Sequence, residues 1–214
     1  MTAPSLSFDT LARALHPLQR PPQGEGWNLD EVHDLLPAAR RHADAGVLVG
    51  VVPREDGPRV VLTLRNDSLR HHAGQVSFPG GRCEPDDRDA LDAALREAHE
   101  EIGLPGTQVQ ALGFLDPLLT VSGFRVLPTV ARIAPEFAPR PDPSEVAEVF
   151  EVPLAFLLAD TNLERIGIDY NGRRRQVLQF RSDPLVTTHR IWGVTASILF
   201  NLRQRLAAMS EAAA

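Results

Sequence analysis

Residues 80–104 carry three glutamates at the end of an alanine-rich run that favours a helix, and no other segment constrains the chain as strongly. On a helix, Glu97 and Glu101 lie one turn apart and only about 40° apart around the axis. Glu100 lies beside them, and stacked like charges repel by roughly a few tenths of a kcal/mol. A cation between the carboxylates removes that cost. Either Arg96, which can reach Glu100 at i,i+4, or a divalent ion such as Mg²⁺ or Mn²⁺, which prefers oxygen ligands, would serve.

The ordinary alternative is a solvated acidic helix face, because glutamate-rich helices are common. The spacing around the glutamates argues against it. A Gly-Gly pair and a short acidic turn precede Arg-Glu-x-x-Glu-Glu-x-Gly-Leu. This pattern resembles the signature of the Nudix hydrolases, which cleave nucleoside diphosphates linked to another group and use divalent metal. The residues that carry the resemblance are Gly81, Arg96, Glu97, Glu100, Glu101, Gly103 and Leu104.

Two departures from the commonest Nudix pattern point to one branch of the family. Asp87 stands where a glutamate is usual, and one extra residue separates the glycine turn from Arg96. Both departures resemble the coenzyme A pyrophosphatases. Residues 61–81 also look like that branch's second signature, Leu-Leu-Thr-x-Arg … Leu-Arg-x-His-x-Gly-x-x-x-Phe-Pro-Gly-Gly, with Val61 in place of a leucine. Together the two signatures span residues 61–104.

The resemblance implies an activity and a set of roles. The expected reaction is metal-dependent hydrolysis of the pyrophosphate bond of coenzyme A or its thioesters, giving adenosine 3′,5′-bisphosphate and 4′-phosphopantetheine or its acyl form. Mg²⁺ or Mn²⁺ is the expected cofactor. Glu97 and Glu101 are expected to bind the metal directly, Glu100 to act as ligand or base, and Gly81 to lend its carbonyl oxygen. Arg96 is expected to orient the glutamates, since an arginine stays protonated and is a poor base.

Residues outside the glutamate cluster have weaker assignments. Asp87 is expected to support neighbouring groups or cap the helix. Glu145 and Glu148 are candidate bases, with a solvated edge carboxylate as the alternative for each. The upstream signature offers three candidates for binding the anionic part of the substrate: Arg65, Arg70 and His71. A strand-end salt bridge is the alternative for Arg65, and a loop hydrogen bond is the alternative for His71. Residues 173–175, three arginines, are interpreted as a solvated hairpin tip rather than a phosphate-binding loop.

Two other functional hypotheses stay open. A Nudix pyrophosphatase for ADP-ribose, NADH or another dinucleotide would share the metal site but show no preference for a 3′-phosphate. A non-catalytic nucleotide-binding module on the same fold is the third hypothesis. Such modules typically lose signature glutamates, whereas this chain keeps all three.

The net charge and the cysteine content limit which binding partners and which cellular location are expected. A net charge of −6 argues against non-specific binding to nucleic acid. All 22 basic residues are arginines, so arginine, histidine, backbone amides or metal must hold anionic substrate groups. Cys83 is the single cysteine, which excludes an internal disulfide and favours a reducing, cytoplasmic location. No apolar run approaches the roughly 20 residues that cross a bilayer, and no secretory signal is expected. Homodimerisation is left open.

Alternating strand and helix patterns predict one α/β domain. The resemblance adds the detail of an α/β/α sandwich with a mixed sheet, an N-terminal helical extension and a C-terminal helix. The expected parts are a helical extension at 1–44, a core at 45–160, and a hairpin with a final helix at 161–214. Strands are predicted at 45–52, 59–65, 109–114, 124–133 and 146–151, with a hairpin within 163–180 that turns at Asn171-Gly172. Helices are predicted within 1–20 and at 30–43, 87–102, 154–158 and 189–208.

Overall fold

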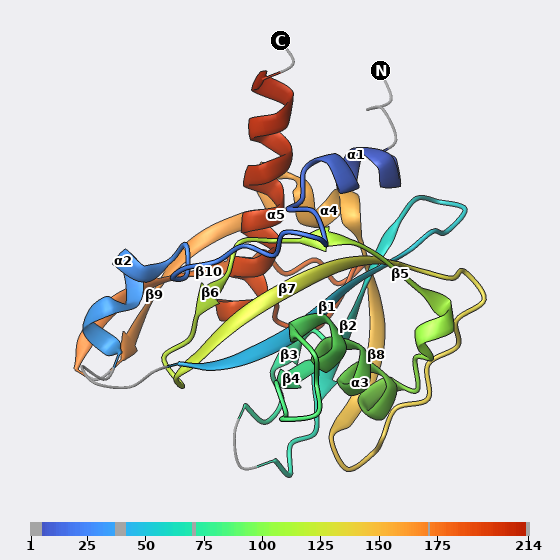
Figure 1. The fold of residues 1–214 in the computed structure, drawn as a ribbon. Helices are drawn as coiled ribbons and strands as arrows, with labels where there is room; N and C mark the ends of the chain where they lie inside the picture. Colours follow the sequence, from blue (N-terminus) through green and yellow to red (C-terminus); the bar gives the residue numbers. More distant parts are fainter. Residues whose placement is uncertain (1–5, 37–41, 70–71, 171, 213–214) are drawn as a thin grey trace.

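The computed structural model describes residues 6–36, 42–69, 72–170 and 172–212 (Figure 1). The elements run in this order: α1 (Phe8–Arg13), α2 (Leu29–Val32), η1 (His33–Leu35), β1 (Ala43–Val52), β2 (Arg59–Arg65), β3 (Val76–Ser77), β4 (Gly80–Arg82), α3 (Ala90–Ile102), η2 (Gly106–Gln108), β5 (Val109–Phe114), β6 (Leu118–Leu119), β7 (Phe124–Ile133), β8 (Val146–Pro153), α4 (Leu154–Leu158), η3 (Asp160–Asn162), β9 (Leu163–Tyr170), β10 (Arg173–Phe180) and α5 (Gly193–Ala212).

Within the described residues, strands β1 to β8 form one mixed sheet. Its central pair, β1 and β7, is parallel and in register from Ala43–Phe124 to Val51–Arg132. The remaining pairs are antiparallel: β2 pairs with β1, β3 and β8, β4 pairs with β1, and β5 and β6 pair with β7. Strands β9 and β10 form a separate two-stranded sheet. The mixed sheet predicted from the sequence is thus confirmed.

Both faces of the sheet are covered, which explains why β1 reads as a continuous apolar run instead of an alternating one. Leu48 and Val52 face the layer that contains α3, in a cluster with Ala94, Ala98 and Ile102 of that helix. The opposite face packs against α1, α4 and α5, with buried side chains such as Leu11, Leu157, Leu199 and Leu202. The predicted three-layer α/β/α arrangement is therefore correct.

Helix α3 begins three residues later than predicted, at Ala90 instead of residue 87. The reason is its cap: the Asp89 carboxylate accepts hydrogen bonds from the backbone N–H groups of Leu91 and Asp92, at 2.9 and 3.0 Å. The predicted stop is confirmed. Gly103 adopts a left-handed conformation (φ 68°) and its N–H reaches a carbonyl of the last turn, as a C-terminal glycine cap does.

The predicted helix at 30–43 is wrong over the residues that the structure describes. The chain makes only the short α2 and η1, and Leu36 is extended (φ −81°, ψ 138°), as expected for a residue before a proline. Residues 37–41 lie outside the described residues. Strand β1 already begins at Ala43, so the expected boundary of a helical extension at residue 44 falls inside a strand.

The C-terminal helix was predicted from residue 189 but begins at Gly193. The four residues before it continue the pairing of β10, because the Phe180 N–H donates to the Ile191 carbonyl and Trp192 bridges to Gln179. Short strands β3, β4 and β6 were not predicted. The other predicted strands, the hairpin and α4 appear at or near their expected bounds.

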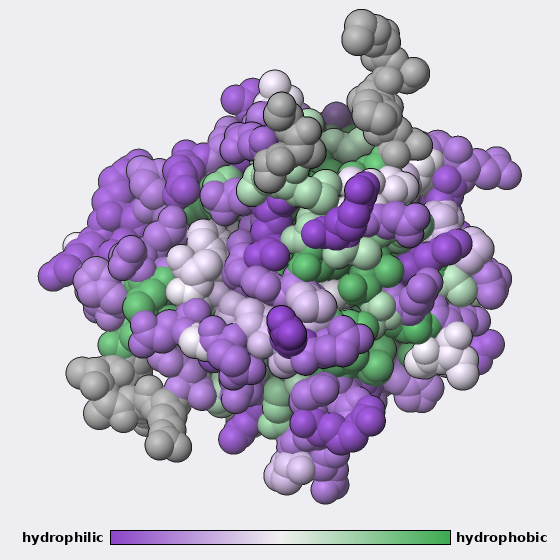
Figure 2. All heavy atoms as spheres, turned by 45° about the horizontal axis from the view of Figure 1, so that its top comes forward, coloured by the Kyte–Doolittle hydropathy of each residue, from purple (hydrophilic) through white to green (hydrophobic). Residues whose placement is uncertain are grey.

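On the face shown in Figure 2, hydrophilic side chains surround smaller apolar patches. In the part of the chain that the structure describes, no helix is long and apolar enough to span a bilayer.

A polar network centred on Asp116 ties the N-terminal segment to α5. Its carboxylate accepts hydrogen bonds from Asn201 (2.9 Å) and Arg205 (3.0 Å), and His16 Nε2 lies 2.7 Å away. Arg205 also donates to the Ala14 carbonyl at 2.7 Å. Burial alone would raise the pKa of Asp116, but the hydrogen bonds from His16, Asn201 and Arg205 lower it below its ordinary value.

We predict that Asp116→Asn destabilises the protein by about 2 kcal/mol at neutral pH, because charge-assisted hydrogen bonds are lost. A carboxyl with a lowered pKa contributes stability above its ordinary pKa of about 4, and loses it as the pH falls further. The gap between wild type and variant in urea unfolding should therefore shrink below about pH 4. A gap that is constant down to pH 3 would contradict this account.

Candidate active site

Helix α3 and the turn into β4 bring the signature residues together. The Gly80 N–H donates to Oε2 of Glu101 at 3.2 Å. A β-carbon on Gly81 would overlap the carboxylate of Glu97, so only a glycine lets that side chain lie against β4. Gly80 has φ 152°, and a β-carbon there would meet the backbone of Gly46 in β1. Gly80 therefore allows two backbone segments to approach closely, and Gly81 leaves room for the carboxylate of Glu97.

Arg96 lies at the centre of the acidic residues. Its guanidinium donates two hydrogen bonds to Asp87, both 3.1 Å, and one each to Glu97 (2.9 Å) and Glu100 (3.1 Å). It also donates to the carbonyl of Arg82 at 3.1 Å, which joins α3 to β4. These bonds, first of all those with Asp87, raise the pKa of Arg96. The predicted contact of Arg96 with Glu100 is present, and Asp87 is a further partner of Arg96.

Glu101 is the buried member of the cluster, with 2% of its surface exposed. Burial raises its pKa to about 7, although the Gly80 N–H and Arg65 oppose the shift. The ion pair with Arg65 spans 3.6 Å between nitrogen and oxygen. Burial also raises the pKa of Glu97, against the effect of Arg96. Burial thus separates the carboxylates of Glu97 and Glu101 from water in part, and neighbouring groups compensate the cost of their charges only incompletely.

The donor chemistry fits a hard divalent cation, because the converging groups are carboxylate oxygens. A buried carboxylate whose pKa is raised to about 7 also favours a nearby positive charge. The side chains themselves are held by Arg96 and Gly80, and no three His, Cys, Asp or Glu side chains among the described residues are arranged as a metal-binding group. Binding a metal would require Glu97 and Glu100 to turn from Arg96.

The remaining candidates lie beside the glutamates, away from them, or outside the described residues. Arg65 lies beside Glu101, and its Nε atom is buried without a hydrogen-bond partner. Glu145 lies near enough to Glu97 and Glu101 for its charge to raise the pKa of both. Glu148 instead pairs with His189 at 3.0 Å, a contact that the sequence did not suggest. Arg70 and His71, both predicted to bind substrate, lie outside the described residues.

The arginines at 173–175 lie at the start of β10. Arg173 and Arg175 both pair with Asp34 of η1, which fixes the N-terminal segment to the hairpin. The prediction that these arginines form a solvated hairpin tip is therefore only partly right, because Asp34 binds two of the three.

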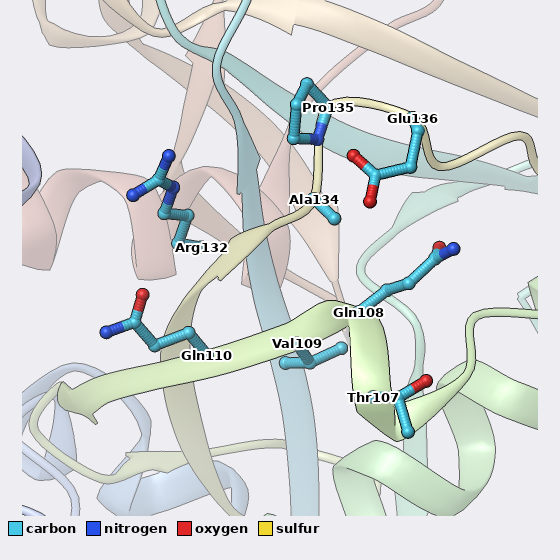
Figure 3. Close-up of a pocket in the computed structure, with 8 residues that line it drawn as sticks. All are labelled: Thr107, Gln108, Val109, Gln110, Arg132, Ala134, Pro135 and Glu136. Carbon is cyan, nitrogen blue, oxygen red and sulfur yellow. The ribbon is translucent and has the colours of Figure 1, made fainter.

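A hollow of about 550 Å³ opens beside the glutamates. It is lined by Arg82, Cys83, Glu84, Pro85 and Glu97, so a ligand there would contact a signature carboxylate. A second hollow, of about 260 Å³, lies at the start of β5 and the end of β7 (Figure 3). Gln108 and Glu136 lie on one side of it and Gln110 and Arg132 on the other, and none of its lining residues belongs to either signature.

Comparisons with known proteins identify the family of the chain. A family model described as "NUDIX domain" matches residues 44–168. A protein named "Uncharacterized Nudix hydrolase NudL" from Photorhabdus laumondii subsp. laumondii is 37% identical, over 80% of this chain and 91% of that protein. One of the same name from Pectobacterium atrosepticum is 40% identical, over 78% and 84%. Among solved structures, the Nudix hydrolase RenU from M. smegmatis is 25% identical over 54% of this chain and 72% of its own, with a TM-score of 0.45.

The chain belongs to the Nudix family, as the matched domain and the curated relatives show. It is a Nudix hydrolase, an enzyme of the class that hydrolyses pyrophosphate bonds and generally uses divalent metal ions.

We predict that Glu101→Gln stabilises the chelator-treated protein above pH 7. A carboxyl whose folded-state pKa is raised contributes stability below its ordinary pKa, and this is lost as the pH rises through about 7. The glutamine carries no charge and avoids the loss, which is worth at most about 3 kcal/mol. Urea unfolding between pH 4 and 9 with EDTA measures the difference. A variant less stable than wild type at pH 8 would contradict the buried-charge interpretation.

Substitution by alanine is expected to affect turnover at Gly81 and stability at Gly80. Gly81→Ala should displace the Glu97 carboxylate, a flexible side-chain end, and lower turnover by about tenfold or more while the melting temperature stays near that of wild type. Gly80→Ala should lower the melting temperature, because its β-carbon meets backbone atoms of Gly46 and Val47. Thermal unfolding and turnover are measured on both variants. Equal melting temperatures for the two would show that this assignment is wrong.

Proposed function

We propose that this Nudix hydrolase cleaves the pyrophosphate bond of coenzyme A or of its thioesters, releasing adenosine 3′,5′-bisphosphate and 4′-phosphopantetheine or its acyl form. The observation that carries the proposal is the contact between the two signatures. Arg65, from the upstream signature, lies 3.6 Å from Glu101 of the metal-binding signature. The residues that resemble the coenzyme A branch therefore adjoin the hydrolytic carboxylates.

In this proposal, Glu97, Glu101, Glu100 and the carbonyl of Gly81 would hold Mg²⁺ or Mn²⁺. An ion held there would supply positive charge opposite the phosphates and lower the pKa of water. Glu100 is the most exposed of the three glutamates, with 55% of its side chain accessible, so it is the one best able to exchange protons with solvent. Glu145 is the second candidate for the base, because its charge raises the pKa of both Glu97 and Glu101.

Arg96 positions the site in this scheme. Its five hydrogen bonds fix the ends of Asp87, Glu97 and Glu100 and anchor α3 to the Arg82 carbonyl. Because its pKa is raised, it stays a cation at every working pH and takes no part in proton transfer. Asp87 supports Arg96 and is assigned no metal contact.

Arg65 is assigned to the anionic part of the substrate. The buried Nε of Arg65 has no hydrogen-bond partner among the described residues, so it can donate to a ligand. The planar guanidinium, with its several N–H donors, suits phosphate oxygens. Arg70 and His71 remain candidates on the resemblance alone. The proposed location is a reducing cytoplasm, which agrees with a single free thiol, Cys83.

The direct test is product analysis by mass spectrometry with Mg²⁺ or Mn²⁺ and four substrates in parallel: coenzyme A, 3′-dephospho-coenzyme A, ADP-ribose and NADH. The proposal predicts release of adenosine 3′,5′-bisphosphate from coenzyme A at the highest kcat/KM. Cleavage of ADP-ribose or NADH alone would retain the pyrophosphatase chemistry and reject the coenzyme A assignment. Tight binding without turnover of any substrate would favour a non-catalytic module.

We predict that Arg65→Ala raises KM for coenzyme A by about tenfold or more, because a charged hydrogen-bond donor is lost. The rise should be smaller for 3′-dephospho-coenzyme A if Arg65 contacts the 3′-phosphate. Arg59→Ala is the matched control: it lies at the other end of β2 and pairs with Asp56. Steady-state kinetics on both substrates decide, and an equal rise in KM for the two would remove the 3′-phosphate assignment.

A further inference from the structure

The outer edge of the β9–β10 hairpin has no partner strand among the described residues. One edge of β10 pairs through Phe180 and Gln179 with residues 191–192, which precede α5, and β9 pairs with the other edge. In Figure 1 the hairpin extends away from the main sheet on the side opposite α3. An unpaired strand edge presents a row of N–H and C=O groups to any strand that approaches it.

The pairing register shows which groups point outward. Tyr170 pairs with Arg173 across a two-residue turn, and the pair that closes such a turn is hydrogen-bonded. Hydrogen-bonded pairs alternate along the hairpin, so Arg165, Gly167 and Asp169 turn their backbone groups away from β10. No backbone hydrogen bond within the described part of the chain reaches these three residues from another segment.

This edge is complementary to itself in charge as well as in backbone hydrogen bonds in one register. If a second copy pairs antiparallel with a two-fold axis at Gly167, Arg165 lies opposite Asp169 of the second copy, and the reverse pair forms too. All outward N–H and C=O groups then find partners, and Ile166 lies opposite Ile168 of the second copy. The residue on the axis has no side chain to collide with itself.

The neighbouring registers are less favourable. Centring the pair on Arg165 sets arginine opposite arginine, and centring it on Asp169 sets aspartate opposite aspartate. Centring it on Ile166 or Ile168 still matches outward groups with outward groups, but it sets no arginine opposite an aspartate. An offset by an odd number of residues would match outward groups with inward ones. Arg165 and Asp169 are exposed. Arg165 has an ion pair with Glu31 at 3.6 Å, and both side chains are about half exposed, so that pair is weak and easily exchanged.

We propose that β9 is an interaction surface for a second copy of this chain, which adds its own β9 antiparallel and centred on Gly167. The product is a four-stranded sheet, β10–β9–β9–β10, across a two-fold axis. Because a single strand pair buries little area compared with a standard interface, the dimer is concentration-dependent. The pairing lies away from the glutamate cluster, so the dimer and the monomer have the same hydrolytic site.

Sedimentation velocity over a range of concentrations tests the proposal. Wild type should show a reversible monomer–dimer equilibrium. Arg165→Asp alone and Asp169→Arg alone each set like charges opposite each other and should weaken association by about tenfold or more. The double variant restores opposite charges at both pairs and should recover the wild-type equilibrium. All three are exposed substitutions, and unchanged hydrolase activity confirms that the fold is retained.

Gly167→Pro gives an independent test at the axis. The Gly167 N–H points outward, so proline removes a donor that the dimer needs and the hairpin does not. Gly167→Ala is the matched control, because its β-carbon meets only the movable guanidinium of Arg174, at 2.7 Å. Loss of the dimer in the proline variant but not in the alanine variant supports the proposal. A strictly monomeric wild type, a dimer insensitive to Gly167→Pro, or a charge-swapped double variant no better than the single ones would overturn it.

Discussion

The guanidinium of Arg96 binds three carboxylates at once, and the arrangement of the site depends on that contact. Without a cation, the last turns of α3 would place Glu97 and Glu100 beside Asp87 with no compensation, and like charges would repel each other. Arg96 removes the repulsion through hydrogen bonds of 2.9 to 3.1 Å and at the same time joins α3 to β4 through the Arg82 carbonyl. One side chain thus sets both the placement of the acids and the docking of the helix.

Glu101 differs because it is buried, and its neighbours compensate its charge only in part. The Gly80 N–H and Arg65 reduce the cost of the charge but leave the pKa near 7. Buried carboxyls with a strongly raised pKa are typical of functional sites, where stability is given up for chemistry. The two signatures meet at this residue. Gly80 is the first residue of β4, Arg65 the last of β2, and Glu101 belongs to α3.

The sequence predicted the parts of the fold that local patterns specify. Strands β1 and β2 carry apolar, valine-rich runs, and Gly103 ends α3 as its left-handed conformation requires. It failed where tertiary context decides: Leu36 before a proline ends the helical turns early, and β3 and β4 have two and three residues and form by pairing with β2 and β1. Spacing on α3 predicted that Arg96 reaches Glu100, but no local pattern links Arg65 to Glu101 or His189 to Glu148, since these partners lie far apart in the chain.

The proposed function requires the carboxylates around Arg96 and Gly80 to take up a divalent cation. The most direct test is calorimetric titration of Mn²⁺ into wild type, Glu97→Gln and Glu101→Gln, with Glu136→Gln in the second hollow as the control. We expect the two signature variants to bind Mn²⁺ at least about tenfold more weakly and the control to bind like wild type. Equal affinity in all four proteins would contradict the account.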